Sequence, residues 1–365
     1  MRCQVGNALT GWRNLAPKLV PVLCGILLAL VACEVGARLL LPPPGLIRFS
    51  ALAEAVNEPG GGGHLDVFQR DEDLFWRFAK NVRLPDDGGA FVGLVSNDRG
   101  LRDPREIPFE KPAGAVRILF LGASMTFGWF LHYDETIVHR TEQILRERFP
   151  ARDITCLNAG VPGYTAFQGW RYLETEGLRY QPDLVVASFG SNDSTRWQGL
   201  GDLEIYRHNQ LTKPVVGLRW SRLAALAWNA FHPWSQHEIN NSRPRLLPEE
   251  FREVLGRIQV TTRSHGIDLL LLVGALRINV DGSKEPGYRR PLQREEISFG
   301  KHIAFGPGPE EGYVDGVRVL QDLARDHTLD EIFFDHCHTT ALANRAMARA
   351  LADKIAPWLL ARGTD

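Results

Sequence analysis

The strongest sign of chemistry in this sequence comes from a serine and a histidine cluster at opposite ends of the chain. Ser124 follows the apolar run 117–121 and stands in the turn 122–128, which contains small residues. The cluster 335–338 reads Asp-His-Cys-His and lies more than two hundred residues further on. A serine hydroxyl is a poor nucleophile near neutral pH, so it needs a base within reach and a carboxylate that orients the base. Together, the two segments indicate nucleophilic serine chemistry.

Within the cluster, His338 is the expected base and Asp335 the residue that orients it. Two side chains three residues apart, in a loop or a first helical turn, can converge on one side of the backbone. His336 is the alternative base, although an adjacent Asp-His pair tends to point its side chains apart. The competing structural interpretation is a polar helix N-terminus with Asp335 as its cap.

Two further segments follow predicted strands. Gly160 stands after the run 154–157, and Asn192 stands after the run 184–188. The carboxyl ends of parallel strands meet at one edge of a sheet, where open α/β folds bind ligands. Each residue also has an ordinary interpretation, Gly160 as a turn glycine with an unusual backbone conformation and Asn192 as a helix cap. Their combination with Ser124 favours a functional role.

In this order, the four segments resemble the sequence blocks of the SGNH subgroup of the GDSL-type esterases and lipases. The resemblance covers roughly residues 90–360. It implies a three-layer α/β/α fold of flavodoxin-like type with a central parallel sheet, and a serine hydrolase that cleaves esters. One position departs from the family, because Ala123 precedes the serine where an Asp is usual. That Asp is not a triad member, so the change concerns loop packing and local hydrogen bonding.

The resemblance also implies the site residues. Ser124, His338 and Asp335 form the catalytic triad that it assigns, with His338 selected over His336 by the spacing of the family motif. An oxyanion hole stabilises the charge that develops on the substrate oxygen. Its implied donors are the backbone N–H groups of Ser124 and Gly160 and the side-chain amide of Asn192. No cofactor and no metal are implied.

The elements that must position these residues alternate between short apolar runs and amphipathic stretches. Such alternation predicts a parallel sheet with helices on both faces. A capping-box pattern at Thr165 and Gln168 predicts the start of one helix. The expected strands are 117–121, 154–157, 184–188 and 269–273, and the expected helices are 133–148, 165–177, 248–264 and 341–360.

An apolar segment near the N-terminus predicts a membrane anchor at 19–41. Its stretch 19–37 carries one charged residue, Glu34, and is just long enough to cross a hydrocarbon core of about 30 Å. The basic residues before it favour a cytoplasmic segment 1–18 and an extracytoplasmic remainder. A lipoprotein modified at Cys33, a cleaved signal peptide and a buried helix are the alternatives.

After the anchor, composition predicts a flexible tether at 42–66 and a hydrolase-like domain at 67–365. Within the domain, 196–245 is rich in aromatic residues and is interpreted as an inserted lid. The segment 97–102 is expected to form a turn, and 279–313 to form a long loop near the site.

Composition excludes some function classes. A formal net charge of -1 and scattered charges argue against a nucleic-acid partner, while 44% hydrophobic residues suffice for a large core. Cys156 and Cys337 are open to either a disulfide or two buried thiols, and no cysteine spacing matches a zinc site. The expected function is an anchored esterase acting on O-acyl or O-acetyl groups of cell-envelope glycans or lipids. An O-acyltransferase and a noncatalytic glycan-binding protein are the alternatives, and the oligomeric state is left open.

Overall fold

The computed structural model describes residues 6–40, 67–71, 73–86, 92–198, 201–212, 223, 242–281 and 312–363. The chain divides into two compact units, one made of Met1–Gly45 with Tyr206–Ile239 and the other of Leu46–Ile205 with Asn240–Asp365. The expected tether, most of the aromatic-rich insertion and most of the expected long loop lie outside the described residues. All candidate site residues belong to the second unit.

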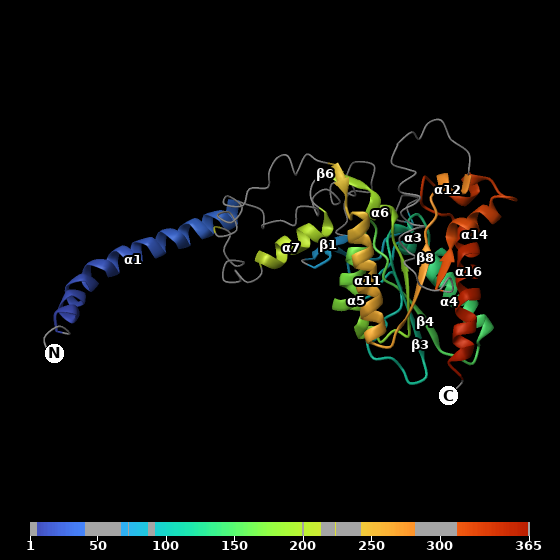
Figure 1. The fold of residues 1–365 in the computed structure, drawn as a ribbon, viewed down its shortest axis with the longest axis horizontal. Coiled ribbons are helices and arrows are strands. Elements are labelled where there is room, and N and C mark those ends of the chain that lie inside the picture. The colour runs from blue at the N-terminus through green and yellow to red at the C-terminus, as the bar shows by residue number, and fades with distance from the viewer. Residues whose placement is uncertain are drawn as a thin grey trace. The chain divides into compact units, whose positions relative to one another are not determined.

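Five parallel strands form the sheet of the second unit, in the order β4-β3-β5-β8-β9 (Figure 1). β3 is buried along its whole length, as a central strand between two helical layers must be. The predicted α/β fold with a central parallel sheet is therefore confirmed. The bounds are β3 Val116–Gly122, β4 Ile154–Asn158, β5 Leu184–Ser188, β8 Asp268–Val273 and β9 Tyr313–Asp315.

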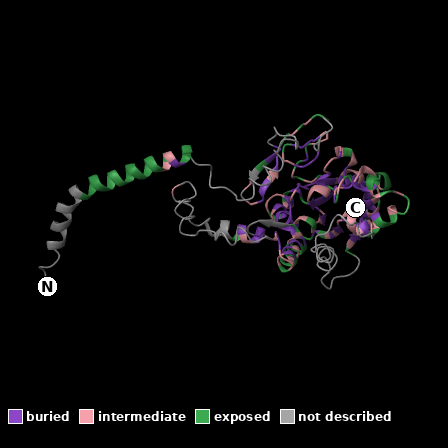
Figure 2. Ribbon diagram, turned by 90° about the horizontal axis from the view of Figure 1, so that it is seen from above, coloured by how far each residue is buried: buried purple, intermediate pink, exposed green. Residues whose placement is uncertain are grey.

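Helices cover both faces of this sheet. α5 (Ala166–Thr175) and α11 (Pro248–Ser264) pack together on one face, and α16 (Ala341–Ala361) packs against α4 (Ile137–Arg148) and α14 (Gly316–Leu323) on the other (Figure 1). Side chains from β3, α4, α14 and α16 share one buried hydrophobic cluster. Burial is concentrated in this layered core (Figure 2). The sheet edge that carries the candidate residues is thus supported from both sides.

Local capping explains where two of the helices start. Thr136 has extended backbone angles and its hydroxyl accepts the N–H of His139, so the expected helix 133–148 divides into a short 3₁₀ turn, η1, and α4. Gln168 accepts the backbone N–H of Thr165 at 2.7 Å, so the predicted capping box is present at the start of α5.

Shorter elements complete the described part of the chain. β1 and β2 form an antiparallel hairpin, and β6 pairs with the distant β7 in a second antiparallel two-stranded sheet. The remaining bounds are β1 Phe68–Asp71, β2 Phe75–Phe78, α3 Ser124–Phe127, η1 Tyr133–Glu135, η2 Gly177–Tyr180, α6 Ser191–Ser194, β6 Arg196–Gln198, α7 Asp202–Thr212, β7 Ser242–Pro244, α12 Arg277–Asp281 and α15 Leu329–Ile332.

The first unit contains the long helix α1, Gly6–Leu40. Its segment Leu19–Leu40 has a mean hydropathy of 2.4 and is exposed over nearly all of its length (Figure 2). Its length and composition suffice to cross a membrane, and a signal sequence would meet the same criteria. The two charged residues near its end pair with each other, because Arg38 Nε lies 2.7 Å from a Glu34 carboxylate oxygen one turn away.

Candidate active site

The turn after β3 presents Ser124 as the first residue of α3. Gly122 and Gly128 frame this turn for steric reasons. A Cβ atom on Gly122 would overlap the Thr126 side chain, and Gly128 ends α3 in the left-handed region at φ 80°. Ala123 stands at the N-cap without a side-chain hydrogen bond, so the family's usual Asp has no substitute there.

The structure brings Ser124, His338 and Asp335 together in one line of hydrogen bonds. His338 Nε2 lies 2.8 Å from Ser124 Oγ, and His338 Nδ1 lies 2.6 Å from Asp335 Oδ2. The histidine ring therefore sits between the serine hydroxyl and the carboxylate. This arrangement can move a proton from the hydroxyl to the ring while the carboxylate holds the ring in place.

Asp335 is held by the backbone as well as by the histidine. Its Oδ1 accepts the N–H groups of Cys337 at 2.8 Å and of His338 at 2.7 Å. Partial burial acts to raise the pKa of the Asp335 carboxyl, but the hydrogen bonds from the His338 side chain and from the two backbone N–H groups outweigh it and lower that pKa. The carboxylate therefore stays charged near neutral pH.

His336 occupies a different position from His338. Its side chain is 60% exposed, and its Nδ1 lies 4.0 Å from Asp335 Oδ1, beyond hydrogen-bonding distance. Asp335, His336 and Cys337 also offer possible metal-ligand atoms within 4.8 Å of one another. Both oxygens of Asp335 already accept hydrogen bonds, however, so a metal ion would compete with the contact to His338.

Asn192 lies in the short helix α6, which follows β5. One hydrogen of its Nδ2 amide is donated to the carbonyl of Tyr164 at 2.9 Å, which fixes the amide plane and leaves a second hydrogen. The backbone N–H of Ser124 is among the N-terminal N–H groups of α3, which have no partner within the helix. Ser124 and Asn192 line the same cavity.

Gly160 differs from these two donors. Its N–H is donated to the side chain of Asn158 at 3.1 Å, and its φ is not in the left-handed region. A Cβ atom at this position would lie 2.5 Å from the backbone nitrogen of Phe127. Glycine is therefore required by the close approach of this loop to α3, and the alternative interpretation of Gly160 as a turn glycine with an unusual backbone conformation is wrong. Asn158 also donates to the carbonyl of Thr126 at 3.0 Å, a role that sequence reasoning missed.

A buried carboxyl supports the Asn192 turn. Asp193 accepts the N–H of Ala166 at 2.7 Å and the N–H of Gly190 at 2.8 Å, and Gly190 adopts a φ of 129° that favours glycine. Burial raises the pKa of Asp193 to about 6, against the opposing effect of these hydrogen bonds and of nearby Arg245.

Aromatic rings surround His338. The rings of Trp129 and Phe130 have centroids 6.1 Å and 5.5 Å from the imidazole, and Phe130 also packs against Phe334 at 5.5 Å. Phe130 has a φ of 66°, an unusual value for a bulky residue. Sequence reasoning missed this wall, although the run Phe127 to Phe130 signals it by its three aromatic residues in four.

The segment 92–115 before β3, called the lead-in below, contacts the segment that carries Trp129 and Phe130 through the side chain of Arg102. The guanidinium is buried and donates to the carbonyls of Gly128, at 2.6 Å, and Leu131. Burial lowers its pKa to about 9. The predicted turn at 97–102 is present, with Gly100 N–H donating to Asn97 O at 3.1 Å, and it aims Arg102 at the segment that carries Trp129 and Phe130.

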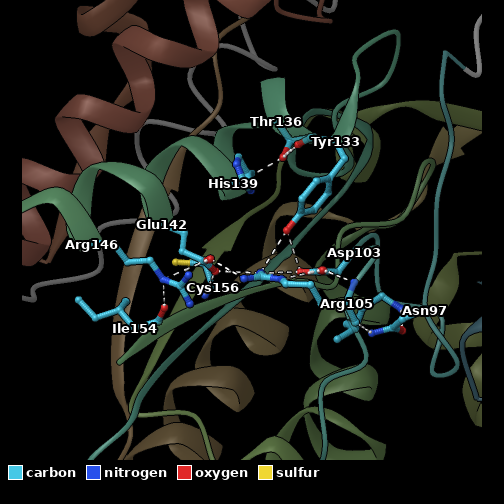
Figure 3. A network of polar contacts seen from close by, with 11 residues as sticks. Asn97, Asp103, Arg105, Tyr133, Thr136, His139, Glu142, Arg146, Ile154 and Cys156 are labelled. Atoms are coloured by element: carbon cyan, nitrogen blue, oxygen red, sulfur yellow. Dashed lines mark hydrogen bonds and ion pairs between the residues drawn. The ribbon is translucent and has the colours of Figure 1, made fainter. Parts of the chain in front are cut away.

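A second polar network lies deeper, between the lead-in and α4 (Figure 3). Arg105 binds Asp103 and Glu142 at once, with closest N–O distances of 2.8 Å and 2.6 Å. Tyr133 donates to Asp103, and Glu142 accepts the N–H of Cys156 at 2.7 Å. Cys156 and Cys337 are both buried free thiols in the structure.

A cavity of about 280 Å³ opens beside Ser124. Ser124 and Asn192 contribute to its wall, and so do the carboxyl ends of β5 and β8. Most of its other lining side chains are apolar, including Met125, Phe189, Leu255, Leu272, Ile278 and Val317. The serine hydroxyl is therefore accessible from a largely apolar space.

Part of the chain that carries this site matches a known protein family. Residues 120–291 match the model of the GDSL-like Lipase/Acylhydrolase family. This part of the chain is therefore similar to that family, and the match supports an ester-hydrolysing serine hydrolase. The matched range includes Ser124, Gly160 and Asn192 and ends before Asp335 and His338. No curated protein matches the sequence.

Solved structures with a similar chain course have low sequence identity. An α/β hydrolase, LAE5, from the metagenome of Lake Arreo is 16% identical, with 67% of this chain and 97% of that chain covered and a TM-score of 0.43. The acetylxylan esterase Axe2 of Geobacillus stearothermophilus is 17% identical, with 66% and 95% covered and a TM-score of 0.42. A GDSL-like lipase of Parabacteroides merdae is 15% identical, with 69% and 99% covered and a TM-score of 0.43.

Proposed function

We propose that the protein is a serine esterase in which Ser124 attacks the ester carbonyl. His338 takes the hydroxyl proton, and Asp335 holds the imidazole in the tautomer that has its free Nε2 toward the serine. The single observation that carries this proposal is the unbroken hydrogen-bonded line of 2.8 Å and 2.6 Å from serine through histidine to carboxylate. Attack forms an acyl-enzyme, and His338 returns the proton to the leaving alcohol.

The negative charge that develops on the carbonyl oxygen needs donors already in place. The N–H of Ser124 and the second hydrogen of the Asn192 amide supply two of them. Gly160 can act as a third donor only by exchanging its bond to Asn158. In the second half of the reaction, His338 deprotonates a water that attacks the acyl-enzyme. An acceptor hydroxyl in place of that water would make the same site an acyltransferase.

The apolar helix suggests where the substrate is found. We propose that α1 anchors the protein in a membrane and that residues after it lie outside the cytoplasm, because basic residues precede the apolar segment. An anchored, extracytoplasmic esterase has ready access to esters of envelope glycans or lipids. A membrane-extraction assay and protease protection of intact cells test the anchor and its orientation.

The chemistry is tested on the detergent-solubilised full-length protein. Ser124→Ala is expected to lower kcat for p-nitrophenyl acetate by about 10⁴-fold or more and to abolish covalent labelling by a fluorophosphonate. Ser264→Ala is the matched control, because that hydroxyl lies exposed at the end of α11. Equal turnover by Ser124→Ala and wild type contradicts the proposal. Absence of both turnover and labelling in wild type favours a noncatalytic binding protein instead.

A further inference from the structure

We infer that the cavity beside Ser124 is an acyl-binding pocket for medium-length chains of about six to ten carbons, so that acetyl is not the preferred acyl group. The inference rests on the proposed function and specifies its substrate class. It depends on three observations, which are the side of Ser124 on which the cavity lies, its size, and the chemistry of its wall.

The position of His338 determines which part of an ester enters the cavity. The leaving alcohol must receive its proton from His338 Nε2, so it departs on the histidine side of the serine. Among the described residues, Ser124, Asn192 and Cys337 line the cavity, whereas His338 does not. Its imidazole packs instead against Trp129 and Phe130. The acyl part, which stays on the serine, is therefore directed into the cavity and the alcohol part toward the aromatic wall.

The size of the cavity exceeds the needs of an acetyl group. An apolar cavity of about 150 Å³ can hold a benzene ring of six carbon atoms. At the same density, about 280 Å³ accommodates on the order of ten carbon atoms. An acetyl group would leave most of this space to water against apolar side chains, which is unfavourable.

The wall is suited to an alkyl chain along most of its length. Leu255 comes from α11, Leu272 from β8, Ile278 from α12 and Val317 from α14, so four elements supply aliphatic surface. The polar lining residues include the segment 190–194, which carries Asn192 at the oxyanion position. The polar groups of 190–194 thus lie near the reacting ester carbonyl, Asn279 adds one polar side chain on α12, and the aliphatic side chains of the four elements suit methylene groups.

Gly274 offers a way to fill the cavity. It follows β8 and lines the cavity, and its φ is outside the left-handed region. A Cβ atom there would meet Met125 Sδ at 3.5 Å and Ser188 Oγ at 3.9 Å, which are ordinary van der Waals distances. A larger side chain at this position therefore extends into the cavity without a backbone clash.

The test measures kcat/KM for p-nitrophenyl acetate, butyrate, hexanoate and octanoate with the detergent-solubilised full-length protein. Each buried methylene is expected to raise kcat/KM by about fourfold, so hexanoate exceeds acetate by about 10²-fold. Gly274→Leu is expected to lower the ratio of octanoate to acetate by at least about tenfold. Because the two rates are compared within one variant, a general loss of activity cancels.

Gly256→Leu is the matched control. Gly256 lies in α11 outside the cavity wall, and a Cβ atom there meets no atom within 4 Å. Its ratio of octanoate to acetate is expected to equal that of wild type. Leu255→Trp, from another element of the wall, replaces Gly274→Leu if thermal unfolding shows that the latter does not fold.

The outcomes separate this inference from the proposed function. A wild-type ratio of octanoate to acetate at or below one overturns the inference, while Ser124-dependent acetate turnover still supports the esterase. A ratio that both cavity variants leave unchanged overturns it too. Failure of the esterase itself appears as turnover that does not depend on Ser124.

Discussion

Two networks in this protein each join a carboxylate to a nitrogen-containing side chain, but they differ in whether that side chain can exchange a proton near neutral pH. One joins Asp335 to His338 and Ser124, and the other joins Asp103, Arg105 and Glu142 (Figure 3). In the second, the carboxylates are only 1% and 3% exposed, and the cation between them cannot release its proton near neutral pH. In the first network, the central group is an imidazole, a type of group that can accept and release a proton near neutral pH.

The difference shows how the same interaction serves structure in one place and chemistry in another. The Arg105 network lies between the lead-in and α4 and fixes both. The His338 network ends on a hydroxyl that faces a cavity, so a substrate can complete it. We therefore expect changes in the first network to reduce stability and changes in the second to reduce turnover.

The largest effect is expected at the imidazole. His338→Ala should lower kcat by about 10⁴-fold or more, and Asp335→Asn by about 10⁴-fold, because the ring loses its proton-accepting role or its orientation. Steady-state kinetics with p-nitrophenyl esters measures both. His265→Ala, at the exposed end of α11, is the control. A loss below about tenfold in His338→Ala would show that another group acts as the base.

Breaking the other network should cost stability. Arg105→Met leaves the buried carboxylates of Asp103 and Glu142 close together without their cation, so the free energy of unfolding should fall by about 3 kcal/mol. Urea denaturation measures this loss, and kcat of the folded variant should stay within a few fold of wild type. Arg325→Met, which removes a surface ion pair with Asp322, should cost less than about 1 kcal/mol. Equal losses of unfolding free energy in Arg105→Met and Arg325→Met would show that the buried network contributes no more to stability than a surface ion pair.

A further carboxyl, that of Asp193, extends the comparison to pH. The pKa of Asp193 is raised to about 6, so between about pH 4 and 6 the native state binds a proton there that the unfolded state does not. This contribution to stability is complete below the unfolded pKa and is lost as pH rises through 6. Asp193→Asn lacks this contribution. The free energy of unfolding of wild type, measured relative to that of Asp193→Asn, should therefore rise by about 2 kcal/mol from pH 7 to pH 4.

Chemical denaturation of both proteins across this pH range measures the effect. Asp326→Asn, at an exposed position, is the control and should show no such trend. A difference between wild type and Asp193→Asn that does not vary with pH would mean that Asp193 titrates normally.

The smallest effect is expected at the second histidine of the cluster. His336 is largely exposed and lies beyond hydrogen-bonding distance of Asp335, so His336→Ala should change kcat/KM by less than about fivefold. The same kinetic assay measures it. A loss comparable to that of His338→Ala would show that the two histidines share the role of base.

The sequence predicted the framework of the fold well, because its elements carry strong periodic signals. The run 117–121 corresponds to β3, and 248–264 corresponds to α11 with the same bounds. β9 was missed, since a strand of three residues within a Gly- and Pro-rich segment shows no period. Its place in the sheet comes from pairing with β8, which is information that no local pattern contains.

The candidate site was predictable where spacing fixes geometry and not where distant segments meet. The separation of Asp335 from His338 was enough to expect their contact, and the structure has it. The bond from Gly160 to Asn158 and the packing of Phe130 against His338 depend on how loops approach one another. Asp193 supports the Asn192 turn through a short-range hydrogen bond from the N–H of Gly190, three residues away in the chain.

The position of His338 near the end of the chain has a consequence for synthesis. The proposed base and its carboxylate lie between β9 and α16, so they reach Ser124 only after the intervening strands β4, β5, β8 and β9 have been synthesised. A nascent or truncated chain that ends before this segment carries the serine turn without its base. Catalysis by the proposed triad thus requires the sheet and the segment after β9 to be present together.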